Sequence, residues 1–251
     1  MVANVLCRRY KSFEVLMNLY KFQTVNEYSL SALSEFSLYF ARTEQMNDPT
    51  ENMFRLLDYN KYDLYSPDLS TLDRMGILSM AFGTAVEVEE SAFMWAHYGN
   101  ELKGFCLVFD FNIFISDIKD SIEKHGRINY RKFPHLLSGE NLINEKSGIE
   151  NIAGANFQLH NLNRIYDVCF FDKPIDFEHE REYRFLAKGY GLKPYSIDSL
   201  LTVIIGEKMS IKDRDILLKT LEKLGIRNKV KVAKVKENSF KVHVTSGESD
   251  L

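Results

Sequence analysis

The chain has 251 residues, of which 45% are apolar and 27% are charged, as expected for a globular protein with a substantial buried core. Its net charge of −3 argues against a protein that coats DNA or RNA, because such binding needs a clear positive excess. The sequence contains no signal peptide, no apolar run of ~18 residues and no C-x-x-C pair, so we expect a cytoplasmic protein without a membrane anchor or a structural zinc site.

Short helices and strands follow one another in the first half of the chain. The spacing of Tyr28, Leu30 and Leu33 predicts a helix, and Asn26 is a suitable N-cap for it. The motif Asn47-Asp48-Pro49 predicts a turn that starts a helix at about residue 50. The other predicted elements are helices at 4–18, 26–34 and 91–98, strands at 19–23, 36–41 and 76–82, and a loop at 58–73.

The second half contains the strand that we expect at the centre of the sheet. Residues 104–109 (GFCLVF) are almost wholly apolar, as in a strand buried on both faces. Ser210 and Asp213 form the start pattern of a helix that Gly225 ends. The remaining predictions are strands at 127–131, 180–187 and 200–206, a mainly helical stretch at 140–168, and a hairpin of 229–235 and 239–244 around Asn238.

This order of elements predicts the fold class. The strands outnumber clean strand–helix–strand units, which favours an α+β fold with a mixed, largely antiparallel central sheet and flanking helices. We expect one domain over residues 1–251, with a core at 18–210 and a C-terminal helix plus hairpin at 210–245.

Acid–base residues gather in one late segment, 178–184 (EHEREYR). Because side chains alternate along a strand, Glu178, Glu180, Glu182 and Arg184 are predicted to share one face. Carboxylates this close raise one another's pKa unless a cation such as Arg184 intervenes, and we expect Arg184 to pair with Glu180 or Glu182. The pattern fits a reactive site and a solvent-facing edge strand with a salt bridge about equally well.

Two further segments combine aromatic and polar side chains. In 94–99 (MWAHYG), Trp95 and Tyr98 share a helix face, with His97 beside them, and a packing role is the alternative to a functional one. We expect all three to form one pocket wall with Glu182. Lys21, between Tyr20 and Phe22, marks an edge strand or presents a cation to a phosphate or ribose.

The whole set of landmarks resembles a large, mostly uncharacterised family of bacterial proteins. These landmarks are L-Y-K-F, F-S-L-Y-F-A, N-D-P-T-E, M-W-A-H-Y-G, K-G-F-C-L-V-F-D, E-x-E-x-R and V-I-I-G, in that order. The likeness covers about residues 18–210.

A more distant resemblance is to ADP-ribosyltransferases, which open with a strand bearing His or Arg and carry a Glu, often as E-x-E, on a late strand. It implies that Glu182 is the catalytic carboxylate and Glu180 its partner, with Lys21 in the first strand. Ser79, or the pair Trp95 and Tyr98, would take the middle place in the transferase pattern, between the first strand and the late Glu. Two features depart from the pattern, because a lysine replaces the usual His or Arg and no S-T-S element is present.

The same resemblance implies a substrate and a setting. NAD would be the substrate, a protein or nucleic acid the acceptor, and the protein a bacterial toxin or antiphage defence effector with an antitoxin or defence partner. The NAD-binding residues would be Lys21, Tyr20, Trp95, His97, Tyr98 and Arg184.

Two other functions remain open from the residues themselves. In a metal-dependent hydrolase or nuclease, Glu180 and Glu182 would bind a divalent cation together with Asp48 or Glu51, and at least three oxygen ligands should then converge. In a non-catalytic ligand-sensing or scaffold domain, the same side chains should be dispersed or pair only with each other.

Overall fold

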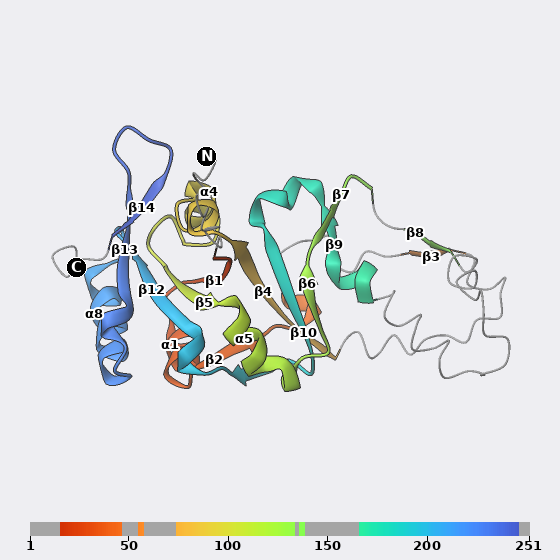
Figure 1. Ribbon diagram of the computed structural model, residues 1–251, viewed down its shortest axis with the longest axis horizontal. Helices are drawn as coiled ribbons and strands as arrows, with labels where there is room; N and C mark the ends of the chain where they lie inside the picture. Colours follow the sequence, from red (N-terminus) through yellow and green to blue (C-terminus); the bar gives the residue numbers. More distant parts are fainter. Residues whose placement is uncertain (1–15, 47–54, 58–73, 134–135, 139–165, 246–251) are drawn as a thin grey trace, which may run out of the picture.

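We describe the protein from a computed structural model, shown in Figure 1. The structure describes residues 16–46, 55–57, 74–133, 136–138 and 166–245. Several predictions lie wholly or largely outside these ranges, namely the helix at 4–18, the turn at 47–49 with its following helix, the loop at 58–73 and the helical stretch at 140–168, of which residues 166–168 are described and helical.

An eight-stranded sheet forms the centre of the described chain, in the order β14-β13-β12-β5-β1-β4-β10-β6. Only β12 and β13 run parallel, and the other neighbours are antiparallel. The predicted α+β class with a mixed, largely antiparallel sheet is therefore confirmed. The strands are β1 (Asn18–Gln23), β4 (Met75–Gly83), β5 (Phe105–Asp110), β6 (Lys124–Arg127), β10 (Glu182–Lys188), β12 (Leu200–Gly206), β13 (Val230–Val235) and β14 (Val242–Thr245).

Three two-stranded sheets flank the large one. They pair β2 with β11, β3 with β8, and β7 with β9. Their bounds are β2 (Ser37–Phe40), β3 (Arg55–Leu57), β7 (Asn129–Arg131), β8 (Leu136–Ser138), β9 (Asp172–Pro174) and β11 (Gly191–Pro194). The β7–β9 pair places Lys173 opposite Tyr130.

Helices cover both faces of the large sheet. On one face, α1 (Glu27–Ser34), α5 (Phe111–Ile118) and α8 (Ile211–Lys223) contribute Leu33, Phe114 and Leu217 to the largest apolar cluster. On the other face, α3 (Ala85–Val88) and α4 (Ala92–His97) contribute Val88 and Trp95 to a second cluster. In Figure 1, α4 lies above the strands, while α1 and α8 lie below them. No helix in the described ranges has the length and apolar character needed to cross a lipid bilayer.

Most local predictions hold because the signals behind them are local. The run GFCLVF forms β5, which lies between β12 and β1 with every side chain from Phe105 to Phe109 buried. Asn26 caps α1, Ser210 caps α8, and Gly225 has the left-handed φ of +72° that ends α8. The predicted hairpin is the β13–β14 pair, whose strands extend the same large sheet.

The large sheet opens between β1 and β4. Strand β1 pairs with β5 along residues 18–23, but it pairs with β4 only over residues 18–20. Beyond Tyr20 the two strands separate, while β4 continues to pair with β10 on its other side. This separation leaves room for side chains from β1, β4 and β10 to meet.

Candidate functional site

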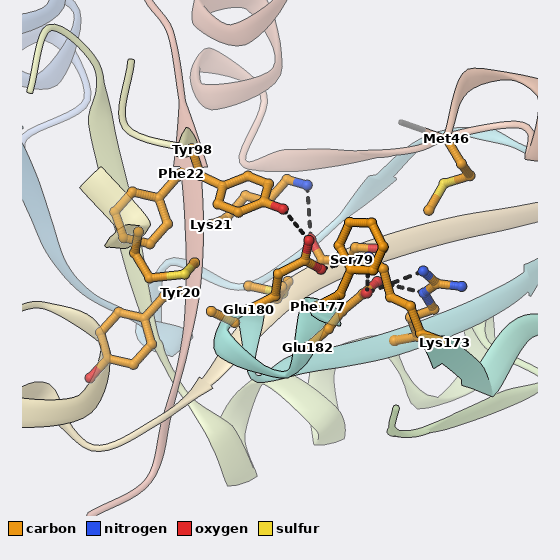
Figure 2. Close-up of a pocket in the computed structure, with 14 residues that line it drawn as sticks. Tyr20, Lys21, Phe22, Met46, Ser79, Tyr98, Lys173, Phe177, Glu180 and Glu182 are labelled. Carbon is orange, nitrogen blue, oxygen red and sulfur yellow. Dashed lines mark hydrogen bonds and ion pairs between the residues drawn. The ribbon is translucent and has the colours of Figure 1, made fainter. Parts of the chain in front are cut away.

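A pocket of about 170 Å³ lies where β1 and β4 separate (Figure 2). Segments far apart in the sequence form it: β1, β4, the end of α4, β9, β10 and the short 3-10 helix η5 (Ile175–Glu180). The residues that line it are Tyr20, Lys21, Phe22, Met46, Ser79, Met80, Ala81, Met94, Tyr98, Lys173, Phe177, Glu180, Glu182 and Arg184.

The floor of this pocket is a buried ion network around Glu182. Glu182 Oε1 accepts a hydrogen bond from Arg184 Nε at 2.5 Å, and Oε2 accepts from Arg184 Nη2 and from Lys173 Nζ, both at 3.1 Å. Arg184 is fully buried and also donates to the carbonyl oxygen of Phe170 at 2.9 Å. The predicted pairing of Arg184 with Glu182 is thus confirmed, and it lies inside the protein rather than on a solvent-facing edge.

This network sets the charge of its members. Burial by itself would raise the pKa of Glu182, but the charge and hydrogen bonds of Arg184, followed by the charge of Lys173, outweigh it and lower that pKa to about 2. Burial would likewise lower the pKa of Lys173, but Glu182 and Glu180 raise it above its ordinary value. Glu182 is therefore an anion, and Lys173 a cation, over the whole physiological range.

Glu180 reaches the same network from a different element than predicted. The expected single strand face from Glu178 to Arg184 is wrong, because Glu178 and Glu180 belong to η5 and only Glu182 and Arg184 lie on β10. Arg181, with a left-handed φ of +51°, turns the chain from η5 into the strand. Glu180 is nevertheless buried, and it accepts hydrogen bonds from Lys173 Nζ at 2.5 Å and from the Tyr98 hydroxyl.

Lys21 lies at the opening between the strands. Its Nζ donates a hydrogen bond to the carbonyl oxygen of Ser79, at 2.9 Å. The backbone of β1 does not pair with β4 at this point, so the lysine side chain supplies the donor for that carbonyl. Burial lowers the pKa of Lys21, although the nearby Glu182 charge partly offsets this. Lys173 and Arg184 offset the charges of Glu180 and Glu182, and Lys21 adds a third basic group that can bind an anionic ligand.

Aromatic rings from three elements border the charged groups. Tyr98 follows α4 and turns its hydroxyl toward Glu180, while the Phe177 ring of η5 lies beside the Lys173 ammonium, 4.7 Å from its centroid (Figure 2). Tyr20 was expected to bind a ligand, but its hydroxyl points away from the charged cluster and only its ring backs the pocket.

The expected placement of Trp95 and His97 in the pocket wall is wrong. Trp95 is buried in the core behind the pocket, with its ring 5.1 Å from that of Phe22 and its indole N–H bonded to the Glu89 carbonyl. His97 lies exposed against the ring of Phe93. The reason is the short helix α4, whose turn directs Tyr98 toward Glu180 while Trp95 packs onto the sheet.

Sequence reasoning missed Lys173 and Phe177 as site residues. Lys173 stands in the segment Asp172–Pro174, which has no motif, and only its pairing with β7 brings it to the carboxylates. Tyr130 was also missed, and its hydroxyl accepts a hydrogen bond from the Glu182 backbone N–H at 2.8 Å. Nothing in the spacing of these residues marks them, because each is placed by a tertiary contact.

The geometry does not favour the metal-ion hypothesis. The Lys173 ammonium lies between Glu180 and Glu182, where a shared divalent cation would have to bind. Within the described ranges no three His, Cys, Asp or Glu side chains are arranged to hold a metal ion. The other proposed ligands, Asp48 and Glu51, lie outside those ranges.

Comparison with known proteins gives a match to one family model over part of the chain. Residues 94–185 match the model of a family described as "Protein of unknown function (DUF2971)". This range runs from α4 to β10 and includes Tyr98, Lys173, Glu180, Glu182 and Arg184. The expected likeness to an uncharacterised family is thus supported over that range, and the family's description assigns no activity. Searches of curated proteins and of solved structures found no match.

Proposed function

We propose that this protein is an ADP-ribosyltransferase-like enzyme that uses NAD, with Glu182 as its central carboxylate. One observation carries the proposal. Lys21 on β1, Ser79 on β4 and Glu182 on β10, which are far apart in the sequence, line a single pocket together with the rings of Tyr98 and Phe177.

The pocket fits one end of NAD better than the whole molecule. Its volume of about 170 Å³ is below the ~300–1,000 Å³ of sites that enclose drug-sized ligands. A nicotinamide ring and its ribose are the portion of this size, and Phe177 and Tyr98 offer faces for the ring. Lys21, a basic group that carries no ion pair in the Glu182 network, suits the pyrophosphate that follows the ribose.

The proposed reaction uses the fixed charge of Glu182. As the bond between nicotinamide and ribose C1 breaks, its electron pair leaves with nicotinamide, and positive charge develops on the ribose. The Glu182 carboxylate, already held in place by Arg184 and Lys173, stabilises this charge without reorganising. An acceptor nucleophile then forms the new bond to C1, and Glu180 orients it and takes its proton.

The direct test is to incubate the protein with NAD and to follow free nicotinamide by chromatography, and transfer of the ADP-ribosyl group with labelled NAD. We expect release by the wild-type protein, loss in Glu182→Gln, and no change in Glu123→Gln, which alters an exposed carboxylate paired with Lys188. Failure of the folded wild-type protein to bind or cleave NAD would contradict the proposal.

From the resemblance we also propose a physiological role. The protein would act as a toxin or antiphage effector that modifies a protein or nucleic acid. Expression of the wild-type chain in a bacterium should then arrest growth, and expression of Glu182→Gln to the same level should not. Equal growth of both cultures, with both proteins folded, would argue against this role.

A further inference from the structure

A second pocket, of about 460 Å³, shares Glu182 with the first. Tyr130 also lines it, and its hydroxyl accepts a hydrogen bond from the Glu182 backbone N–H. The other lining residues are Phe82, Glu87, Ser91, Phe93, Arg127, Ile128, Glu178, His179 and Arg181. The proposed NAD reaction uses none of these others.

Arg127 provides this pocket with a positive charge, which also helps to lower the pKa of the Glu87 carboxyl. Its guanidinium lies over the Phe82 ring, 4.6 Å from the centroid, and it forms no ion pair with any residue in the described ranges. The other arginine, Arg181, is instead paired with Glu87 at 2.9 Å. A guanidinium held on a ring, with its N–H groups not taken by a carboxylate, is well suited to bind a phosphate in two-point fashion.

The lining of the pocket also includes an aromatic surface. The ring of Phe93 is 37% exposed, and its centroid lies 5.6 Å from that of His179 and 4.5 Å from that of His97. Exposed rings of this kind stack well on a nucleobase, since every base has a flat π face. The Glu178 carboxylate at the same pocket can accept hydrogen bonds from the amino groups of a base.

The backbone that presents this surface is constrained. Arg181 has a left-handed φ of +51°, and main-chain hydrogen bonds hold it on both sides. The Arg181 N–H donates to the Glu178 carbonyl, and the Arg181 carbonyl accepts from the Phe82 N–H. Such a conformation is uncommon for a residue with a side chain and is often kept at ligand sites. In the sequence, Arg181 stands between Glu180, which lines the first pocket, and Glu182, which lines both pockets.

We propose that this second pocket binds a nucleoside monophosphate group, with its phosphate on Arg127 and its base on Phe93 and His179. The volume of about 460 Å³ falls within the range of small-molecule sites. A single nucleotide is favoured over a nucleic-acid strand, because the chain has a net charge of −3 and the pocket carries three glutamates beside its two arginines. The group could belong to a free mononucleotide or to the adenylate half of a dinucleotide.

The test is isothermal titration of the full chain with 5′-AMP, adenosine and inorganic phosphate. We expect 5′-AMP to bind best, with Arg127→Ala and Phe93→Ala each weakening it about tenfold or more. The affinity for adenosine, which has no phosphate, should be unchanged by Arg127→Ala. Arg227→Ala, at an exposed arginine outside both pockets, should leave the affinity unchanged, and melting temperatures should verify that every variant is folded.

Competition then separates the two sources of the ligand. If NAD displaces 5′-AMP, the pocket takes the adenylate half of a dinucleotide, and if both bind together, it takes a separate nucleotide. Absence of 5′-AMP binding, or binding lost in Lys21→Ala but kept in Arg127→Ala, would overturn the inference. Tighter binding of a single-stranded oligonucleotide with a steep salt dependence would overturn it in favour of a nucleic-acid surface.

This inference does not rest on the proposed transferase activity. Nucleotide binding that depends on Arg127 would stand even if NAD were never cleaved, and NAD cleavage that depends on Glu182 would stand without it.

Discussion

The Lys21 ammonium and the Ser79 carbonyl are joined by a 2.9 Å hydrogen bond across the opening between β1 and β4. In a continuous sheet a backbone N–H would bond this carbonyl, so the lysine side chain takes the place of the missing strand contact. Lys21 is therefore held in the lining of the pocket by this hydrogen bond.

The first prediction concerns Lys21→Met, which keeps the apolar stem and removes the charge. We expect the affinity for NAD to fall about tenfold or more, because a charge-assisted bond to the pyrophosphate is lost, while the protein stays folded. Binding measured by titration, with the melting temperature alongside, checks this. Lys208→Met, at an exposed lysine outside both pockets, is the control, and an equal loss in the two variants would count against a binding role for Lys21.

The second prediction concerns Glu182→Gln, which keeps the size of the side chain and removes its charge. If that charge stabilises the transition state, nicotinamide release should slow about 10²–10³-fold. Glu180→Gln should impair donor cleavage less than it impairs transfer to the acceptor. A folded Glu182→Gln protein with full activity would end the role proposed for Glu182.

The third prediction concerns Arg184→Ala, which leaves the Glu182 carboxylate buried with Lys173 as its remaining partner in the network described here. Removing one partner of a buried ion pair typically costs ~3–5 kcal/mol, and we expect the free energy of unfolding to fall by this amount. Chemical denaturation measures it. Lys103→Ala breaks the exposed pair with Glu101 and should have little effect on stability, because solvent screens such a pair. Equal effects would mean that the buried network adds no stability.

The fourth prediction concerns acid stability. The pKa of Glu182 is about 2 in the folded protein, against an ordinary value of 4.5, so the unfolded chain binds this proton more readily. The stability that this carboxylate contributes is fully present above pH 4.5 and is lost as the pH falls from there toward 2, by on the order of 3 kcal/mol. Denaturation at a series of pH values should show a shallower acid dependence in Glu182→Gln. If the free energy of unfolding had the same pH dependence in both proteins, Glu182 would have the same pKa in the folded and unfolded states, and the prediction would be wrong.

Local sequence signals were sufficient for much of the fold. The run GFCLVF identified β5 because a strand buried on both faces has no polar side, and the caps Asn26 and Ser210 identified α1 and α8 because capping bonds form within one turn. The period of two also placed Glu182 and Arg184 on one face of β10, and their contact follows from that.

The sequence by itself therefore determined most of the strands and helices in the described ranges, the α+β class and the Glu182–Arg184 pair. Only the tertiary structure decided that Lys173 bridges Glu180 and Glu182, that Tyr98 rather than Trp95 or His97 faces them, and that the pair is buried. The reason is physical: caps and periodicity act over a few residues along the chain. The site instead depends on where β1 leaves β4 and on the β7–β9 pairing, which join residues that no short-range pattern connects.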